Sequence, residues 1–100
     1  MILGSVRREL ARTLGDRLDA IVLFGSHARG EARPHSDIDV LVVVRGEFDY
    51  SDLMHRTSSG LAALSLQNDV VISRIFVSRE QYEQARTPFL LNVRREGVAV

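Results

Sequence analysis

The chain has 100 residues, 45% of them hydrophobic, and its 13 arginines are balanced by 13 acidic residues, which gives a net charge of zero. This length and composition suit a single small domain over residues 1–100, and the zero net charge excludes the overall positive field of a dedicated nucleic-acid-binding protein. Because no apolar run exceeds five residues and no cysteine is present, we expect a soluble cytoplasmic protein without a secretory signal, a membrane span, a disulfide or a cysteine-ligated metal.

The first third of the sequence predicts a helix followed by a buried strand. Ser5 is a suitable N-cap, and apolar residues four positions apart predict one buried stripe on the helix: Val6, Leu10 and Leu14, with Leu18 as a further candidate. Gly15 is expected to end this helix. Residues 20–24, AIVLF, form a short continuous apolar run that is typical of a strand buried on both faces, and such a strand needs covering helices.

The strand ends at Gly25 and Ser26, which open a polar loop rich in glycine and arginine. Gly25 can adopt backbone angles that other residues avoid, so a ligand can approach the main chain there. Residues 27–29 are expected to start a short helix whose free amides would attract an anion, and Gly30 and Pro34 would then break it. The alternatives are an ordinary turn at Gly25 and an ordinary helix cap at Ser26.

The charged side chains of this loop are candidates for ligand contacts. Because the chain contains no lysine, a phosphate must be bound by arginine, backbone amides or a metal. Arg29 and Arg33 are both candidates, and the sequence does not decide which of them points inward. His27 and His35 have no third histidine or cysteine nearby, so we expect them to lie on the surface or behind the ligands rather than to bind a metal.

Asp37 and Asp39 stand at the start of a second apolar run, residues 40–44. Because side chains alternate along a strand, both carboxylates should project from one face, with their Cα atoms about 7 Å apart. Magnesium prefers oxygen ligands and keeps positions free for substrate phosphates, so the pair is a suitable half-site for magnesium and a nucleotide. The alternative is two solvated carboxylates, but a Gly-Ser strand end, an Arg- and Gly-rich loop and Asp-x-Asp within about 25 residues favour a functional site.

The rest of the chain predicts three helices and one strand. A helix should run from Ser51 or Asp52 to about residue 66, weakened by residues 58–60, and a strand should follow over residues 70–77. Two helices complete the chain, one over 78–86 with a capping box and one with Thr87 as N-cap and Gly97 past its end. This order predicts an α/β (α+β) protein with a small mixed β-sheet flanked by helices.

The site residues carry a family resemblance. Gly25-Ser26, ten residues, and then Asp37-Ile38-Asp39 resembles the signature of the DNA polymerase β-type nucleotidyltransferase superfamily, and GSHARGEARPHSDIDVLV is close to its minimal (MNT), single-domain members. The ending TPFLLNVRREGVAV is similar to the C-terminal helix of small bacterial members. The resemblance implies that Gly25 and Ser26, with Arg29 as a further candidate, bind the triphosphate of ATP or another NTP. It also implies that Asp37 and Asp39 are catalytic and bind two Mg²⁺ ions.

One feature departs from the family pattern. Active members typically have a third carboxylate inside the strand after the long helix, whereas residues 70–75 here read VVISRI. Asp69 stands at the mouth of this strand, where a turn residue is the simpler interpretation, and Asp49 and Asp52 are more remote candidates. The departure predicts nucleotide binding with weak transfer by the chain alone.

The resemblance also implies a partner. Minimal members are often the antitoxin of a bacterial toxin-antitoxin pair and bind, or in some cases adenylylate, an all-helical HEPN ribonuclease. Three functions stay open: transfer of a nucleoside monophosphate, AMP in the first instance, to an acceptor; an antitoxin that acts mainly by protein binding; and a nucleotide-binding module without turnover. Since 100 residues leave no room for a separate substrate domain, we expect the acceptor on a partner protein rather than on nucleic acid.

Overall fold

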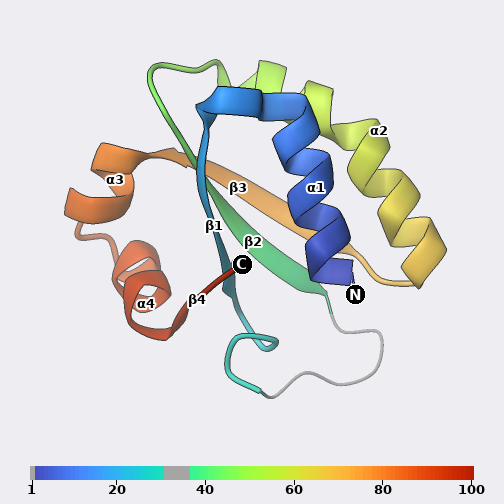
Figure 1. Cartoon of the computed structure of the whole chain (residues 1–100). Coiled ribbons are helices and arrows are strands. Elements are labelled where there is room, and N and C mark those ends of the chain that lie inside the picture. The colour runs from blue at the N-terminus through green and yellow to red at the C-terminus, as the bar shows by residue number, and fades with distance from the viewer. Residues whose placement is uncertain (1, 31–36) are drawn as a thin grey trace.

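Four strands form one mixed sheet with helices packed on both faces (Figure 1). The structure is a computed structural model that describes residues 2–30 and 37–100. Its elements in chain order are α1 (Ile2–Leu14), the 3-10 helix η1 (Gly15–Arg17), β1 (Leu18–Phe24), β2 (Ile38–Val44), α2 (Tyr50–Asn68), β3 (Ile72–Ser78), α3 (Arg79–Gln84), α4 (Pro88–Glu96) and β4 (Val98–Ala99). The predicted α/β architecture with a small mixed sheet is confirmed.

The strand order of the sheet is β3-β2-β1-β4. β1 pairs antiparallel with β2, which places Phe24 opposite Asp39, and β2 pairs parallel with β3, which places Asp39 opposite Ser73. The short strand β4 was not predicted. It pairs antiparallel with β1 at Val22 and Leu23, and two residues are too few to produce a recognisable alternation in the sequence.

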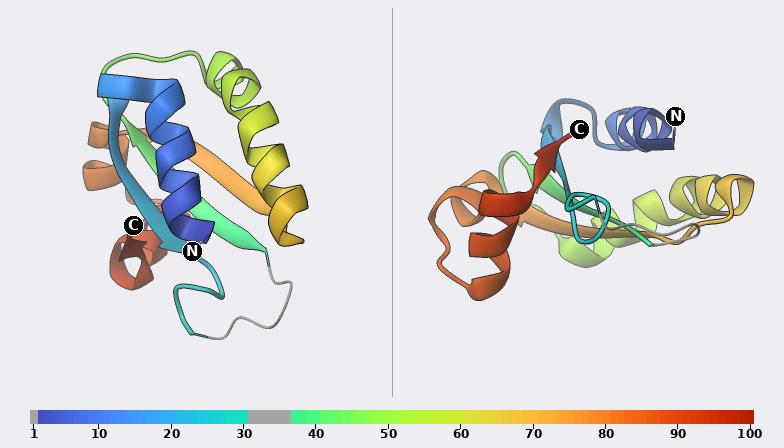
Figure 2. Two further views of the ribbon diagram at one scale, coloured as in Figure 1. Left: turned by 45° about the vertical axis from the view of Figure 1, so that its right-hand side comes forward. Right: turned by 90° about the horizontal axis from the view of Figure 1, so that it is seen from below.

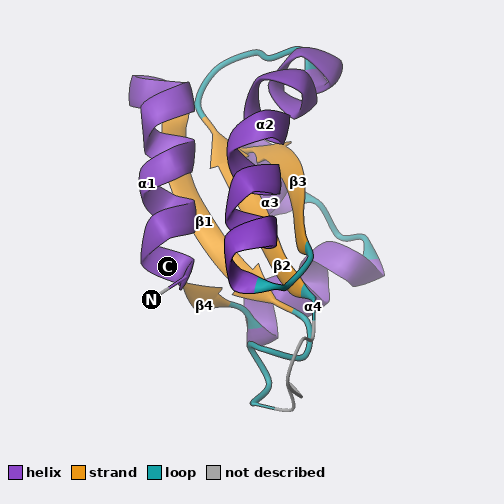
Figure 3. Ribbon diagram, turned by 90° about the vertical axis from the view of Figure 1, so that its right-hand side faces the viewer, coloured by secondary structure: helices purple, strands orange, loops and turns teal. Residues whose placement is uncertain are grey.

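Alternate residues of β2 contribute to two separate cores. Val40, Val42 and Val44 pack with residues of α1 and α2, whereas Leu41 and Val43 pack with residues of α3 and α4. The views in Figure 2 and Figure 3 show these two pairs of helices on opposite sides of the sheet. The prediction that a continuously apolar strand is covered by helices on both faces is therefore confirmed.

Several local predictions are confirmed. The stripe of Val6, Leu10 and Leu14 is buried, and α1 ends at Leu14, directly before Gly15. Leu18 does not belong to the stripe, because it lies on β1. Ser78 and Gln81 form the predicted capping box of α3, and the side chain of Thr87 caps α4 at the amide of Leu90. Within the described part of the chain, no helix is both long and apolar enough to cross a membrane.

Other element boundaries were wrong. α1 begins at Ile2 rather than after Ser5, because Ile2 and Leu3 pack against the core and hold the first turn in place. α2 begins at Tyr50 because the side chain of Asp49, rather than Ser51 or Asp52, accepts the capping hydrogen bond. It continues to Asn68 without a break at residues 58–60. β3 begins two residues later than predicted, β1 begins two residues earlier, and α3 ends two residues earlier.

Candidate functional site

A turn at Gly25 carries the chain out of β1 at one edge of the site. Gly25 has φ +76°, and its carbonyl accepts a hydrogen bond from the amide of Arg29 at 3.3 Å. The amide of Gly30 donates to the carbonyl of His27 at 3.4 Å, and Gly30 has φ +73°. Residues 26–30 are therefore turns. The prediction of a short helix over 27–29 is wrong because the left-handed conformation of Gly30 keeps the helical turn from continuing.

The carboxylate of Asp39 packs against the backbone of Gly25. Antiparallel pairing of Phe24 with Asp39 brings the two strands together at this point. A Cβ atom added to Gly25 would lie 2.5 Å from Oδ2 of Asp39, closer than side-chain atoms can pack. The structure therefore brings Gly25 and Asp39 together, and only glycine leaves room for the carboxylate.

Asp37 and Asp39 lie at the start of β2, on the side of the sheet covered by α3 and α4. This side follows from the alternation along β2, because Leu41 belongs to the core beneath those helices and Val40 to the opposite core. Asp37 is exposed and Asp39 is half-buried. Asp37 directly precedes the strand, and its charge acts on Asp39.

The electrostatic environment of Asp39 is unfavourable for its charge. Burial raises the pKa of Asp39 above its ordinary value, the negative charge of Asp37 raises this pKa further, and His27 lowers it to a smaller extent. His27 therefore lies close enough to Asp39 to act on its charge. A cation bound beside Asp39 would relieve the repulsion that Asp37 exerts on its charge.

The oxygen atoms of this pair fit the magnesium ion that the sequence implies. Both donors are hard carboxylate oxygens, one exposed and one half-buried at the start of a rigid strand. Mg²⁺ is commonly bound by one or two carboxylates while water and substrate phosphates fill its other positions. Asp37 and Asp39 would hold the ion, and the raised pKa of Asp39 is the observation of this structure that favours a cation here.

The positions beside the carboxylates on β3 are not acidic. Ser73 lies opposite Asp39 in the parallel register, and the amide of Ile38 donates to the carbonyl of Val71 at 2.8 Å, so Val71 lies at the level of Asp37. The neighbouring Arg74 faces the other side of the sheet, where its Nε donates to Oγ1 of Thr57 on α2 at 3.1 Å. β3 thus contributes a hydroxyl next to Asp39, and no carboxylate.

Asp69 does not complete the pair. It is the C-cap residue of α2 with φ +52°, exposed and three positions before β3 begins, in agreement with its interpretation as a turn residue. Among residues 2–30 and 37–100, no three side chains of the His, Cys, Asp or Glu type are grouped closely enough to hold a metal ion. Asp49 and Asp52 begin α2, beyond the far end of β2 from Asp37.

A hollow of about 230 Å³ lies beside Gly25, and α4 forms one of its walls. Arg29 lines it together with Phe24 and Gly25, so the structure places Arg29 next to the predicted phosphate-binding turn, which Ser26 also belongs to. Arg33, Pro34 and His35 lie outside the described residues.

The sequence analysis did not predict that residues of α4 would line this hollow. The lining residues of α4 are Phe89, Asn92, Val93 and Glu96. Their spacing of three, four and seven residues marks one helix face, a signal that was present but did not indicate which strand that face would meet.

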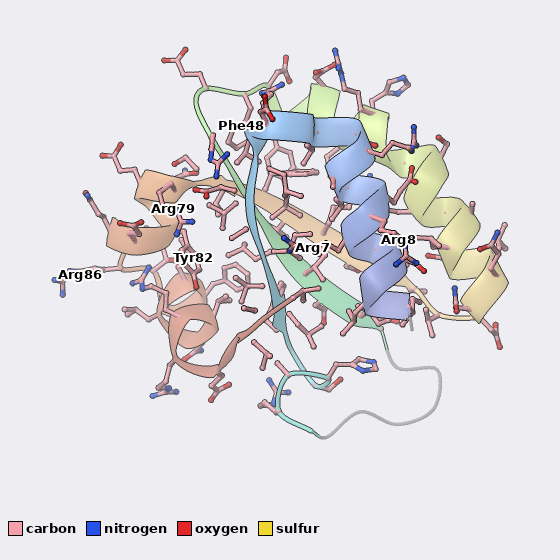
Figure 4. All side chains as sticks on the ribbon, in the orientation of Figure 1. Arg7, Arg8, Phe48, Arg79, Tyr82 and Arg86 are labelled. Carbon is pink, nitrogen blue, oxygen red and sulfur yellow. The ribbon has the colours of Figure 1, made fainter. Side chains whose placement is uncertain are left out.

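The arginines of α1 and the α3 region are separated on the surface. Arg7 and Arg8 lie on α1, whereas Arg79 and Arg86 lie on the opposite side of the view, next to Tyr82 (Figure 4). Arg79 is held by Asp19, whose Oδ2 accepts a hydrogen bond from its Nε at 2.7 Å. These four arginines do not form one continuous basic surface.

Comparison with known proteins identifies relatives along nearly the whole chain. The family described as "Nucleotidyltransferase domain" matches residues 3–93. "Putative protein adenylyltransferase MJ0141" of Methanocaldococcus jannaschii is 31% identical over 99 residues, which cover 99% of this chain and 95% of that protein. "Putative protein adenylyltransferase MJ0604" of the same organism is 40% identical over 83 residues, 81% of this chain and 76% of that protein.

Solved structures share the fold at lower sequence identity. A crystal structure described as a putative nucleotidyltransferase from Sulfolobus solfataricus superposes with a TM-score of 0.68 at 22% identity, covering 98% of this chain and 75% of that chain. A crystal structure described as a toxin-antitoxin with AMP-PNP has a TM-score of 0.62 at 23% identity, covering 94% of this chain and 68% of that chain. At such identities these likenesses establish the fold alone.

Proposed function

Because this chain belongs to the nucleotidyltransferase domain family, we propose that it binds a nucleoside triphosphate, ATP in the first instance, and transfers its nucleoside monophosphate to an acceptor hydroxyl. The observation that carries the proposal is the contact between Asp39 and Gly25. In this contact the half-buried carboxylate of Asp39 lies against the turn at Gly25, where a phosphate can approach the main chain. The two predicted halves of the site, metal and phosphate, therefore meet.

Each residue has a distinct role in this proposal. Asp37 and Asp39 would hold Mg²⁺, which would neutralise charge on the phosphates. The backbone at Gly25 and Ser26 and the guanidinium of Arg29 bind and orient the triphosphate, which puts the α-phosphorus in line with the acceptor. The acceptor oxygen forms a bond to the α-phosphorus while the bond to the bridging oxygen of pyrophosphate breaks. Pyrophosphate leaves with that electron pair, and the hydroxyl proton passes to solvent.

A second candidate function is supported by the composition of β3. Ser73 on β3 and Val71, which precedes β3, occupy the positions beside the carboxylates. Phosphoryl transfer depends strongly on charge stabilisation at the reacting phosphate. A site with two carboxylates would bind nucleotide and transfer slowly. The chain would then act mainly as an antitoxin that binds a small helical partner protein of the HEPN type, and the acceptor hydroxyl would belong to that partner.

The test is nucleotide binding in the Asp37→Asn, Asp39→Asn double variant. We expect ATP with MgCl₂ to raise the Tm of the wild type and to leave the Tm of the double variant unchanged. Asp69→Asn is the matched control, because asparagine tolerates the left-handed conformation at this cap, and it should retain the full shift. An equal shift in the double variant would refute the assignment of Asp37 and Asp39.

Transfer is tested separately. The protein is incubated with ATP, MgCl₂ and any small helical protein encoded by an adjacent reading frame, and the masses of both chains are measured. An added mass of one AMP on the partner supports transferase function. Stable co-purification without added mass supports the second candidate.

A further inference from the structure

One row of paired residues crosses three neighbouring strands at the site. Phe24, the last residue of β1, pairs with Asp39 on β2, and Asp39 pairs with Ser73 on β3. β2 lies between the other two strands (Figure 3). Because neighbouring strands are about 4.8 Å apart, the turn at Gly25 and the side chain of Ser73 lie on opposite sides of Asp39.

The hydroxyl of Ser73 faces the same side of the sheet as the carboxylate of Asp39. Val77, four positions further along β3, belongs to the core beneath α3 and α4, and Ile75 packs against that core. Side chains two positions apart share one face of a strand, so Ser73 also points to this side. Ser73 and Asp39 are therefore neighbours on one face.

This hydroxyl is accessible and has no structural role. Among residues 2–30 and 37–100, no group forms a hydrogen bond with the side chain of Ser73. Every buried side-chain oxygen or nitrogen of these residues has a hydrogen-bond partner, so the unbonded Oγ of the half-buried Ser73 is open to solvent. Ser78, at the end of the same strand, instead uses its Oγ to cap α3. A serine hydroxyl that caps nothing is available as a nucleophile.

The row places this hydroxyl opposite the expected leaving group. In-line displacement requires the attacking and leaving oxygens on opposite sides of the phosphorus, and it depends mainly on positioning and charge stabilisation. A nucleotide whose β- and γ-phosphates bind at the Gly25 turn, with its α-phosphate beside Asp39, presents to β3 the side that faces away from pyrophosphate. Ser73 is the residue of β3 at that level.

We propose that Ser73 is an internal acceptor, and that the chain transfers one nucleoside monophosphate from a nucleoside triphosphate to its own Ser73 Oγ. The inference rests on the proposed function, because the nucleotide is bound at the same site. Oγ forms a bond to the α-phosphorus while the bond to the bridging oxygen of pyrophosphate breaks. Pyrophosphate leaves with that electron pair, and the hydroxyl proton passes to water. The phosphodiester then occupies the site, so the reaction stops after one nucleotide per chain.

The experiment is incubation of the whole chain with ATP and MgCl₂ in the absence of any other protein, followed by mass measurement of the intact chain. We expect the added mass of one AMP, no further addition with time, and assignment of the adduct to Ser73 by fragmentation of proteolytic peptides. The modified chain should also show no further rise in Tm with fresh ATP and MgCl₂, because the attached AMP prevents a second nucleotide from binding.

Two variants separate the acceptor from the nucleotide site. Ser73→Ala removes the acceptor oxygen, so the added mass should be lost while ATP with MgCl₂ still raises Tm. Ser65→Ala is the matched control, because Ser65 is also a half-buried serine but lies on α2, on the other face of the sheet, and the added mass should be unchanged. In Ser73→Asp a carboxylate replaces the internal acceptor, so transfer by that variant requires a hydroxyl on a separate molecule.

The outcomes distinguish the inference from the proposed function. A wild-type chain that gains no mass although ATP raises its Tm would overturn the inference and leave nucleotide binding standing. An adduct on another residue, or an adduct that persists in Ser73→Ala, would also overturn the inference. Absence of both the added mass and the rise in Tm would overturn the inference and the proposed function together.

Discussion

Replacing Gly25 by alanine should destabilise the protein for two separable reasons. The substitution adds one methyl group at a residue with φ +76°, a conformation that is strained for any residue with a Cβ. The methyl carbon would also lie 2.5 Å from Oδ2 and 3.4 Å from Cγ of Asp39, so the carboxylate must move. The first effect concerns the turn, and the second concerns the geometry of the site.

A second glycine isolates the first effect. Gly46 has φ +73°, and an added Cβ would meet no atom within 4 Å, so Gly46→Ala carries conformational strain alone, about 1–2 kcal/mol. Gly25→Ala should carry the same strain plus the displacement of Asp39, which by comparison with overpacked cores is worth about 1–3 kcal/mol more. For a domain of this size each kcal/mol lowers Tm by about 4–8 °C. The two variants should therefore differ by several degrees.

The assay is thermal unfolding of both variants, followed by Gly25→Ala in an Asp39→Ala background. Asp39→Ala removes the clashing Oδ2 together with the rest of the carboxyl group, and leaves Cβ of residue 39 at 3.6 Å, an ordinary contact distance. In that background the loss from Gly25→Ala should shrink to the loss from Gly46→Ala. If Gly25→Ala and Gly46→Ala destabilise the wild type equally, Asp39 moves aside freely and the reasoning is wrong.

Three further predictions concern the carboxylates and the buried polar contacts. Burial and the charge of Asp37 raise the pKa of Asp39, so between the ordinary and the raised pKa the folded protein retains a proton that the unfolded chain has lost. The free energy of unfolding therefore falls as pH rises from the ordinary aspartate pKa, about 3.9, to the raised value. Asp39→Asn should therefore raise Tm at pH 7 in metal-free buffer, with no gain below about pH 3.9; an equal gain at both pH values would contradict this. Ser73→Asp places a third carboxylate opposite Asp39 and should increase transfer by at least roughly tenfold in a labelled-ATP assay, whereas Arg74→Asp, on the other face, should not. Thr57→Val removes the Oγ1 acceptor of Arg74 and should lower stability by about 1–3 kcal/mol in denaturant unfolding, and an unchanged midpoint would show that water replaces the bond.

The sequence predicted those features of the fold that depend on local chemistry. The stripe on α1, the capping box of α3 and the cap at Thr87 are determined by side chains within a few residues of one another, and each was located correctly. Element ends that depend on tertiary packing were not. Ile2 and Leu3 extend α1 because they pack against a core assembled from distant segments, which no local pattern shows.

The same division applies to the candidate site. Asp37 and Asp39 on one face follow from the two-residue alternation of a strand, and the need for glycine at residue 25 follows from its turn. The face of α4 toward the site depends on how α4 packs against β1, and the register of β3 depends on pairing across the sheet. The sequence therefore identified the carboxylates but did not show that Ser73 lies beside them while Arg74 points to α2.

The structure of the site itself argues for a ligand, independently of any relative. Asp39 is placed where burial and a like charge both oppose its ionisation, although asparagine would fit the same space without that penalty. Gly25 is required next to it in a conformation that few other residues accept. Two locally unfavourable features at one point are expected where function rather than stability determines the residues. A cation that binds both carboxylates removes the electrostatic penalty, so stabilisation of the wild type by Mg²⁺ with nucleotide should exceed the gain from Asp39→Asn.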